Sequence, residues 1–205
     1  MNHSAEIEAS PIVQFRVATQ RVAKFVSGTL TFSDLPLLQV LPQNVTNLPG
    51  LTGINLTKTA IKDLSALRNA PALQRISLSG STVTDIEALS SIKSLVWLDL
   101  SHTRVQDISA LSGLLMLEEL NLSFTDITHV SNLRRLTKLT ELSLMGTGVT
   151  DLSGLSDCAR LSMLDLAYSH VQDLDPIKRL SRLQWVNCRG LSVEIGIRNR
   201  RVFRS

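Results

Sequence analysis

The sequence is poor in aromatic residues and in cysteine. Aromatic side chains make up only 4% of the 205 residues, namely five Phe, two Trp and one Tyr, although 43% of the residues are apolar. The predicted core is therefore aliphatic, and the position of each aromatic side chain is informative. Only two cysteines occur, Cys158 and Cys188. Both fall at places that are otherwise apolar, which indicates buried small hydrophobes and not a disulfide or a metal pair.

Several features of membrane, secreted or catalytic proteins are missing. No apolar run reaches the ~18 residues of a membrane span, and the start of the sequence has no basic stretch followed by an apolar one. No H-E-x-x-H, G-x-S-x-G or glycine-rich phosphate loop occurs. These absences predict an intracellular, cytoplasmic protein that is not an enzyme, does not enter a membrane and needs no cofactor.

A frame of 22 residues recurs without insertion or deletion, giving six full copies from residue 51 and the start of a seventh. Each copy opens on a leucine, and these are Leu51, Leu73, Leu95, Leu117, Leu139, Leu161 and Leu183. Counted from that leucine, the fourth and sixth places are also apolar. A fixed period of this length with an L-x-x-L-x-L core is typical of a leucine-rich repeat solenoid.

The pattern inside one copy predicts its local structure. Places three to seven alternate between polar and apolar side chains, which predicts one short strand of a parallel sheet. Place nine is Thr or Ser in all six full copies, where a hydroxyl can bond to backbone groups that a bend leaves open. Place thirteen is Asp in five of them and His129 in the other. An acid just before a short helical turn can cap that turn, which the apolar places fourteen and seventeen then join to the core.

The two ends of the chain depart from this frame. Residues 12–27 predict a helix that covers the open end of the first repeat, with apolar residues at helical spacing at Phe15, Ala18, Val22 and Phe25. A basic targeting helix is the alternative interpretation, and the acidic residues Glu6 and Glu8 argue against it. We assign residues 1–50 to an N-terminal cap made of a helix and a degenerate repeat at 29–50, residues 51–190 to the repeats and residues 191–205 to a C-terminal cap or basic tail. The expected fold class is α/β, a solenoid with a parallel concave β-sheet, short helical turns on the convex side and an N-terminal helical cap.

The repeat form L-x-x-L-x-L-x-x-T-x-V-x-D-I-x-x-L resembles the repeats of internalins and of the leucine-rich regulatory subunit of type-one protein phosphatase. The resemblance is strong over residues 51–190 and weak over residues 29–50. It implies a non-catalytic module that binds another protein and, on the phosphatase branch, one that regulates an enzyme.

Large and acidic side chains gather at the places that should face the open side of the sheet. Both tryptophans, the tyrosine and one phenylalanine are among them, although an aliphatic fold does not need them there. With strands ~4.8 Å apart, Trp97 and Trp185 should lie about 19 Å from each other, the breadth of a protein-binding patch. We predict that this face binds a partner with basic and apolar side chains through Trp97, Asp99, His102, Glu119, Phe124, Glu141, Met145, Met163, Asp165, Tyr168 and Trp185.

Basic residues gather elsewhere, in a chain whose formal net charge is +3. They suggest an alternative function, a structural subunit of a large assembly or ribonucleoprotein that holds RNA or an acidic partner. This alternative rests on Arg134, Arg135, Lys138, Arg179 and Arg182 of the convex side and on Arg198, Arg200, Arg201 and Arg204 of the C-terminal segment.

Overall fold

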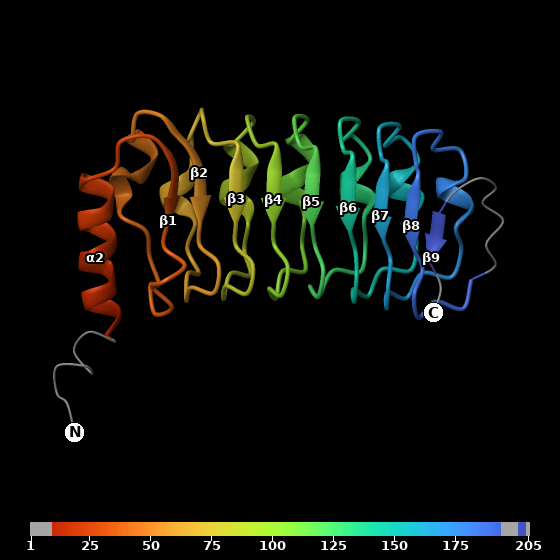
Figure 1. Cartoon of the computed structure of the whole chain (residues 1–205), viewed down its shortest axis with the longest axis horizontal. Coiled ribbons are helices and arrows are strands. Elements are labelled where there is room, and N and C mark those ends of the chain that lie inside the picture. The colour runs from red at the N-terminus through yellow and green to blue at the C-terminus, as the bar shows by residue number, and fades with distance from the viewer. Residues whose placement is uncertain (1–9, 194–200, 204–205) are drawn as a thin grey trace, which may run out of the picture.

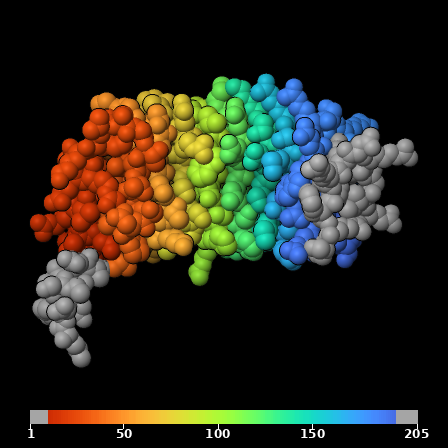
Figure 2. Space-filling view, in the orientation of Figure 1, coloured from red at the N-terminus to blue at the C-terminus, as the bar shows by residue number. Residues whose placement is uncertain are grey.

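The computed structural model describes residues 10–193 and 201–203 and shows an elongated stack of repeats (Figure 1). One parallel sheet of nine strands runs through these residues in chain order. The strands are β1 (Gly28–Thr31), β2 (Leu51–Asn55), β3 (Arg75–Ser77), β4 (Trp97–Asp99), β5 (Glu119–Asn121), β6 (Glu141–Ser143), β7 (Met163–Asp165), β8 (Trp185–Asn187) and β9 (Arg201–Phe203). In the space-filling view each part of the chain borders the parts that precede and follow it along the long axis (Figure 2).

The sheet keeps the 22-residue frame as its register. From β2 to β8 each residue pairs with the residue at the same place of the next repeat, as Leu98 does with Leu120. The predicted parallel solenoid is therefore confirmed. The strands from β3 to β8 cover only places three to five, which is shorter than the predicted three to seven. Inter-repeat bonds nevertheless continue past them, since the Leu100 N–H donates to Asn121 O at 2.9 Å.

Short 3-10 helices return the chain from one strand to the next. They are η1 (Gln43–Asn47), η2 (Ser65–Leu67), η3 (Glu87–Ser91), η4 (Ser109–Gly113), η5 (Ser131–Leu133), η6 (Ser153–Leu155) and η7 (Asp175–Ile177). The acidic residue at place thirteen caps five of these turns by accepting the backbone N–H two residues ahead, as Asp63 Oδ1 does from Ser65 at 2.7 Å. The bonds to the Ser65 amide and hydroxyl lower the pKa of Asp63. The predicted capping role is confirmed.

The leucines and other apolar residues of the frame form one continuous aliphatic core. Leu95, Leu98 and Leu100 of a single repeat are all buried, and the equivalent residues of the neighbouring repeats pack on them. Both cysteines are buried, as their apolar places predicted. Burial, and then the charge of Asp157, raises the pKa of the Cys158 thiol to about 11.

The hydroxyl at place nine is bonded in the threonine repeats but not in the serine repeats. Four threonines donate to the place-six carbonyl of their own repeat at 2.6–2.8 Å, and these are Thr59, Thr103, Thr125 and Thr147. Ser81 Oγ and Ser169 Oγ are buried without a hydrogen-bond partner among the described residues. The methyl group of threonine restricts its side-chain rotamer, whereas serine lacks this restraint.

We expect the replacements Ser81→Thr and Ser169→Thr to stabilise the protein. Each adds a buried hydrogen bond and a buried methyl group, together worth about 1 kcal/mol, or roughly 2–4 °C in Tm for a chain of this size. Thermal unfolding followed by circular dichroism measures the change. The reverse replacement Thr103→Ser should lower Tm by a similar amount. A fall in Tm for both serine replacements would show that the turn has no room for the methyl group.

Helix α2 (Pro11–Ala23) lies beside β1 at the N-terminal end of the sheet (Figure 1). It begins at Ser10, whose Oγ accepts the Val13 N–H at 3.3 Å, and Gln14, Ala18 and Val22 face the interior. Gln14 is buried because its Oε1 accepts the Leu37 N–H at 2.7 Å. The predicted stripe was therefore wrong by one position at its start: Phe15 is 37% exposed and Gln14 takes its place.

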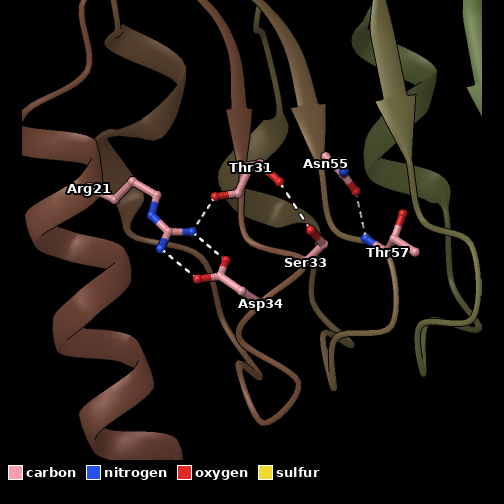
Figure 3. A network of polar contacts seen from close by, with 6 residues as sticks. All are labelled: Arg21, Thr31, Ser33, Asp34, Asn55 and Thr57. Atoms are coloured by element: carbon pink, nitrogen blue, oxygen red, sulfur yellow. Dashed lines mark hydrogen bonds and ion pairs between the residues drawn. The ribbon is translucent and has the colours of Figure 1, made fainter.

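A polar cluster fixes α2 to the chain that follows β1 (Figure 3). The Arg21 guanidinium donates to both carboxylate oxygens of Asp34 at 2.7 and 2.9 Å and to Thr31 O at 2.5 Å. The hydrogen bond from Arg21 lowers the pKa of Asp34. Arg21 therefore joins the helix to the end of β1.

In the described part of the chain no helix has the length and apolar content needed to cross a membrane.

Candidate functional site

We define the concave face as the side chains at places three, five and seven of each repeat. A hollow of about 320 Å³ lies on this face. Trp97 of β4 and Trp185 of β8 bound it, and the three strands between them supply the rest of its wall and floor. Its lining is Trp97, Glu119, Leu120, Asn121, Glu141, Leu142, Ser143, Met163, Asp165 and Trp185. Residues far apart in the sequence meet here because the register places the third residue of each repeat in one row.

The hollow is acidic. Glu119 and Glu141 are direct partners in the β5–β6 register, and neither forms an ion pair within residues 10–193. Like charges on adjacent strands repel each other, so the pair is unfavourable for the isolated sheet. A cation that entered the hollow would relieve this repulsion.

The carboxylates at place five also have a structural role. Asp165 Oδ1 accepts the Ala167 N–H at 2.9 Å, and Asp99 Oδ1 accepts the Ser101 N–H at the same distance. Asn121 Oδ1 makes the equivalent bond to the Ser123 N–H at 3.0 Å. Because an amide oxygen serves this turn as well, the negative charges of Asp99 and Asp165 are not required by the fold.

One wall of the hollow is held by a basic residue of the preceding repeat. The Arg75 guanidinium lies over the Trp97 ring, 4.5 Å from its centroid. This cation–π contact stabilises the orientation of the indole. Arg75 also occupies the face of Trp97 on the β3 side, so the side toward β5 is the one that borders the hollow.

The backbone turn after each strand has a feature that the sequence analysis did not identify. All seven residues at place eight have a positive φ between 55° and 77°, and they are Lys58, Gly80, His102, Phe124, Gly146, Tyr168 and Gly190. Glycine adopts this left-handed conformation freely, whereas other residues lose about 1–2 kcal/mol. The recurrence of glycine at three of the seven positions was the signal in the sequence.

Aromatic side chains at place eight form what we call the aromatic rim, defined as His102, Phe124 and Tyr168. The His102 and Phe124 rings stack with their centroids 4.7 Å apart and their planes 15° from parallel. The Phe124 ring lies against Gly146, where an added Cβ would approach Cδ1 to 2.6 Å. In the same way the Tyr168 ring lies against Gly190. These glycines thus leave room for the ring of the preceding repeat.

Comparison with known proteins gives structural matches only. No protein-family model matches the chain, and no curated protein matches its sequence. The crystal structure of internalin C2 from Listeria monocytogenes has a TM-score of 0.72 at 27% sequence identity, over 89% of this chain and 77% of its own. The crystal structure of internalin F from the same bacterium has a TM-score of 0.65 at 20% sequence identity, over 89% of this chain and 67% of its own. Together with the 22-residue parallel register, these matches identify the fold. The chain is a leucine-rich repeat protein.

Leucine-rich repeat proteins of this kind present an extended concave surface, and the fold is a typical scaffold for protein–protein interaction. In this leucine-rich repeat protein the described residues contain no group of three His, Cys, Asp or Glu side chains that could hold a metal ion. His102 and His170, which stand three repeats apart in sequence, both have exposed side chains.

The structure divides the eleven predicted concave residues into groups. Six line the hollow, and they are Trp97, Glu119, Glu141, Met163, Asp165 and Trp185. His102, Phe124 and Tyr168 form the aromatic rim. Met145 is half-buried at place seven and Asp99 is half-buried at place five. Sequence reasoning missed Asn121 and Ser143, which complete the polar floor and share the place-five row with Asp99 and Asp165.

The basic residues of the convex side are partly neutralised in the leucine-rich repeat protein. Arg134 Nε donates to Asp157 Oδ2 at 2.8 Å, and Lys178 forms an ion pair with Asp175. Lys138 Nζ lies 2.9 Å from Met116 Sδ. Arg135, Arg179 and Arg182 are exposed. Of the C-terminal arginines, Arg198, Arg200 and Arg204 lie outside the described residues, and Arg201 is described only as part of the β9 backbone.

Proposed function

We propose that this leucine-rich repeat protein is a non-catalytic interaction module that binds a partner protein through the hollow of its concave face. The observation that supports this proposal is that Glu119 and Glu141 lie next to each other between two indole rings and form no ion pair with any other residue of 10–193. An aliphatic solenoid needs neither the charges nor the rings for its own stability. By resemblance to the phosphatase regulatory subunit, we extend the proposal to a partner that is an enzyme under regulation.

The chemistry of the hollow defines the partner surface. Glu119, Glu141 and Asp165 favour a basic group, and the indoles of Trp97 and Trp185 favour an apolar stem or a cation over a ring face. An arginine or lysine combines both features, because its charged end extends from an apolar stem. The proposed partner therefore places at least one basic side chain in the hollow.

The alternative function, a subunit held to RNA or an acidic partner by its basic residues, has weaker support. The ion pairs Arg134–Asp157 and Lys178–Asp175 reduce the charge available on the convex side. The acidic hollow would repel a phosphate backbone that approached the concave face. We also propose an intracellular, cytoplasmic location, because a buried thiol such as that of Cys158 suits a reducing compartment.

Reversing the charges of the hollow tests the proposed function. The full chain is used to capture its partner, which mass spectrometry identifies, and the affinity is then measured with purified proteins. We expect Glu141→Lys to weaken binding about tenfold and the double replacement Glu119→Lys/Glu141→Lys about 100-fold, because each desolvated charge pair contributes roughly 1.5 kcal/mol or more.

Glu87→Lys provides a matched control. Glu87 lies at the start of η3 on the convex side, and its reversal changes the net charge by the same amount as Glu141→Lys does. We expect it to change the affinity less than about twofold, as is usual for an exposed charge outside an interface. Equal affinities for the double variant and the parent protein would refute binding through the hollow.

A further inference from the structure

The aromatic rim is kept in an unfavourable backbone conformation by the repeat. The amide of Phe124 donates to Met145 O at 2.7 Å, and the amides of His102 and Tyr168 make the equivalent bonds to the next repeat at 2.8 Å. The Gly80 amide makes the same bond at 2.8 Å. The turn is therefore set by the ladder of backbone bonds and does not depend on the side chain. Glycine would satisfy it at every repeat.

The fold by itself gives no reason for large rings at these positions. Phe124 is 43% exposed and Tyr168 is 50% exposed, so about half of each ring meets solvent. An exposed ring on a left-handed, non-glycine residue combines backbone strain with an apolar surface. Strained residues of this kind cluster at binding sites, where the surrounding structure imposes the strain.

The rim lies over the same strands as the hollow, displaced along the strand direction. Phe124 and Tyr168 each stand five residues after a residue that lines the hollow, Glu119 of β5 and Met163 of β7. Five residues of fully extended chain would span about 16 Å, and the turn at place eight makes the separation shorter than this. Half-buried Met145 stands at place seven of the repeat between them. A segment that contacts both the hollow and the rim must therefore run along the strands and not along the long axis of the solenoid.

We propose that the aromatic rim is a second docking surface for the partner that enters the hollow, and that the partner contributes one extended segment to both. This inference rests on the proposed function. The segment carries a basic residue for the hollow and, about five residues away, an apolar residue that packs on Phe124 and Tyr168. The hollow carboxylates argue for a polypeptide over a nucleic acid, whose stacked bases would bring phosphates with them.

A peptide selection tests this arrangement. Random peptides of about 12 residues, which extend over ~40 Å and can span both surfaces, are displayed on phage and selected on the full chain. We expect the enriched peptides to hold a basic and an apolar residue about five positions apart. Their affinity is then measured for the parent protein, for the rim variant Phe124→Gly/Tyr168→Gly and for the hollow variant Glu119→Lys/Glu141→Lys.

We expect each variant to bind the enriched peptides about tenfold or more weakly than the parent protein does, since each variant removes one of the two contact surfaces. Lys58→Gly is the matched control. Lys58 has the same backbone conformation, with φ 57°, but lies three repeats before Phe124. Its replacement should leave peptide binding unchanged and raise Tm by about 2–4 °C through relief of the same strain.

The outcomes separate the two proposals. Peptides that lose affinity for the hollow variant but not for the rim variant would overturn the inference and leave the proposed function intact. Peptides that bind all variants equally would contradict both. Failure to enrich any peptide, or enrichment without a fixed spacing, would also overturn the inference. The inference would also be overturned if a single-stranded RNA oligonucleotide bound the parent protein but not the rim variant.

Discussion

Replacing Trp97 and Trp185 together by alanine is expected to weaken partner binding about 1,000-fold. An interface tryptophan typically contributes about 2 kcal/mol or more, and each 1.4 kcal/mol corresponds to a tenfold change in affinity. The two indoles bound opposite ends of the hollow, so the partner loses both apolar walls at once. Isothermal titration calorimetry with the purified partner measures the loss.

The same double variant should remain folded. Both indoles are half-exposed, and the core leucines beneath them are unchanged. Trp97 also loses its contact with Arg75, a cation–π interaction of about 0.5–1 kcal/mol at an exposed site. We expect Tm to fall by less than about 5 °C. The control variant Leu115→Ala/Met116→Ala removes two exposed apolar side chains next to the η4 turn and should bind as the parent does. Affinity retained after loss of both tryptophans would disprove the role of the hollow.

Gly154→Ala is expected to be the most destabilising small replacement. A Cβ at Gly154 would lie 2.2 Å from Val130 O and 2.6 Å from Val130 C, which are backbone atoms of the preceding repeat. These atoms cannot move aside without separating two repeats. Overpacking of this kind costs about 3 kcal/mol, equivalent to roughly 6–12 °C in Tm. Thermal and urea unfolding of the purified variant measure the loss.

Gly113→Ala is the matched control for this prediction. A Cβ at Gly113 would approach only Lys93 Nζ, at 2.8 Å, and that atom is the end of a flexible, exposed side chain. We expect Tm to change by less than about 3 °C, or to rise slightly, because alanine restricts the unfolded chain. If both glycine variants melt at the same temperature, close approach between repeats does not limit stability here.

The fold could be predicted because the apolar residues recur in the sequence with a fixed period of 22 residues. Leu98, Leu120 and Leu142 occupy the same place of successive repeats, and a parallel sheet in register is the simplest arrangement that buries them together. The capping of the 3-10 turns could also be predicted, since Asp63 and its equivalents precede five of these turns. The row of hollow residues at place three was predictable for the same reason. The sequence placed Trp97, Glu119, Glu141, Met163 and Trp185 on one face, and the structure joins them in one hollow.

Other features could not be predicted because they depend on backbone geometry or on single contacts. The left-handed turn at place eight is imposed by bonds between repeats, so Phe124 and Tyr168 gave no sign of it, and glycine at three of the seven positions was its one signal in the sequence. The burial of Gln14 in place of Phe15 follows from one hydrogen bond to the Leu37 N–H. The charge of Arg134 was counted as available for binding, although Asp157 of the following repeat pairs with it.

Because the register is constant, the distance between the two indoles is set by the number of whole repeats between them. Trp97 and Trp185 are separated by four strand steps, and each step adds about 4.8 Å. Losing or duplicating one 22-residue unit between them would resize the opening by that increment while every other side chain kept its orientation. A lineage of such proteins could thus fit targets of different widths by recombination alone, with no change to the residues that grip them.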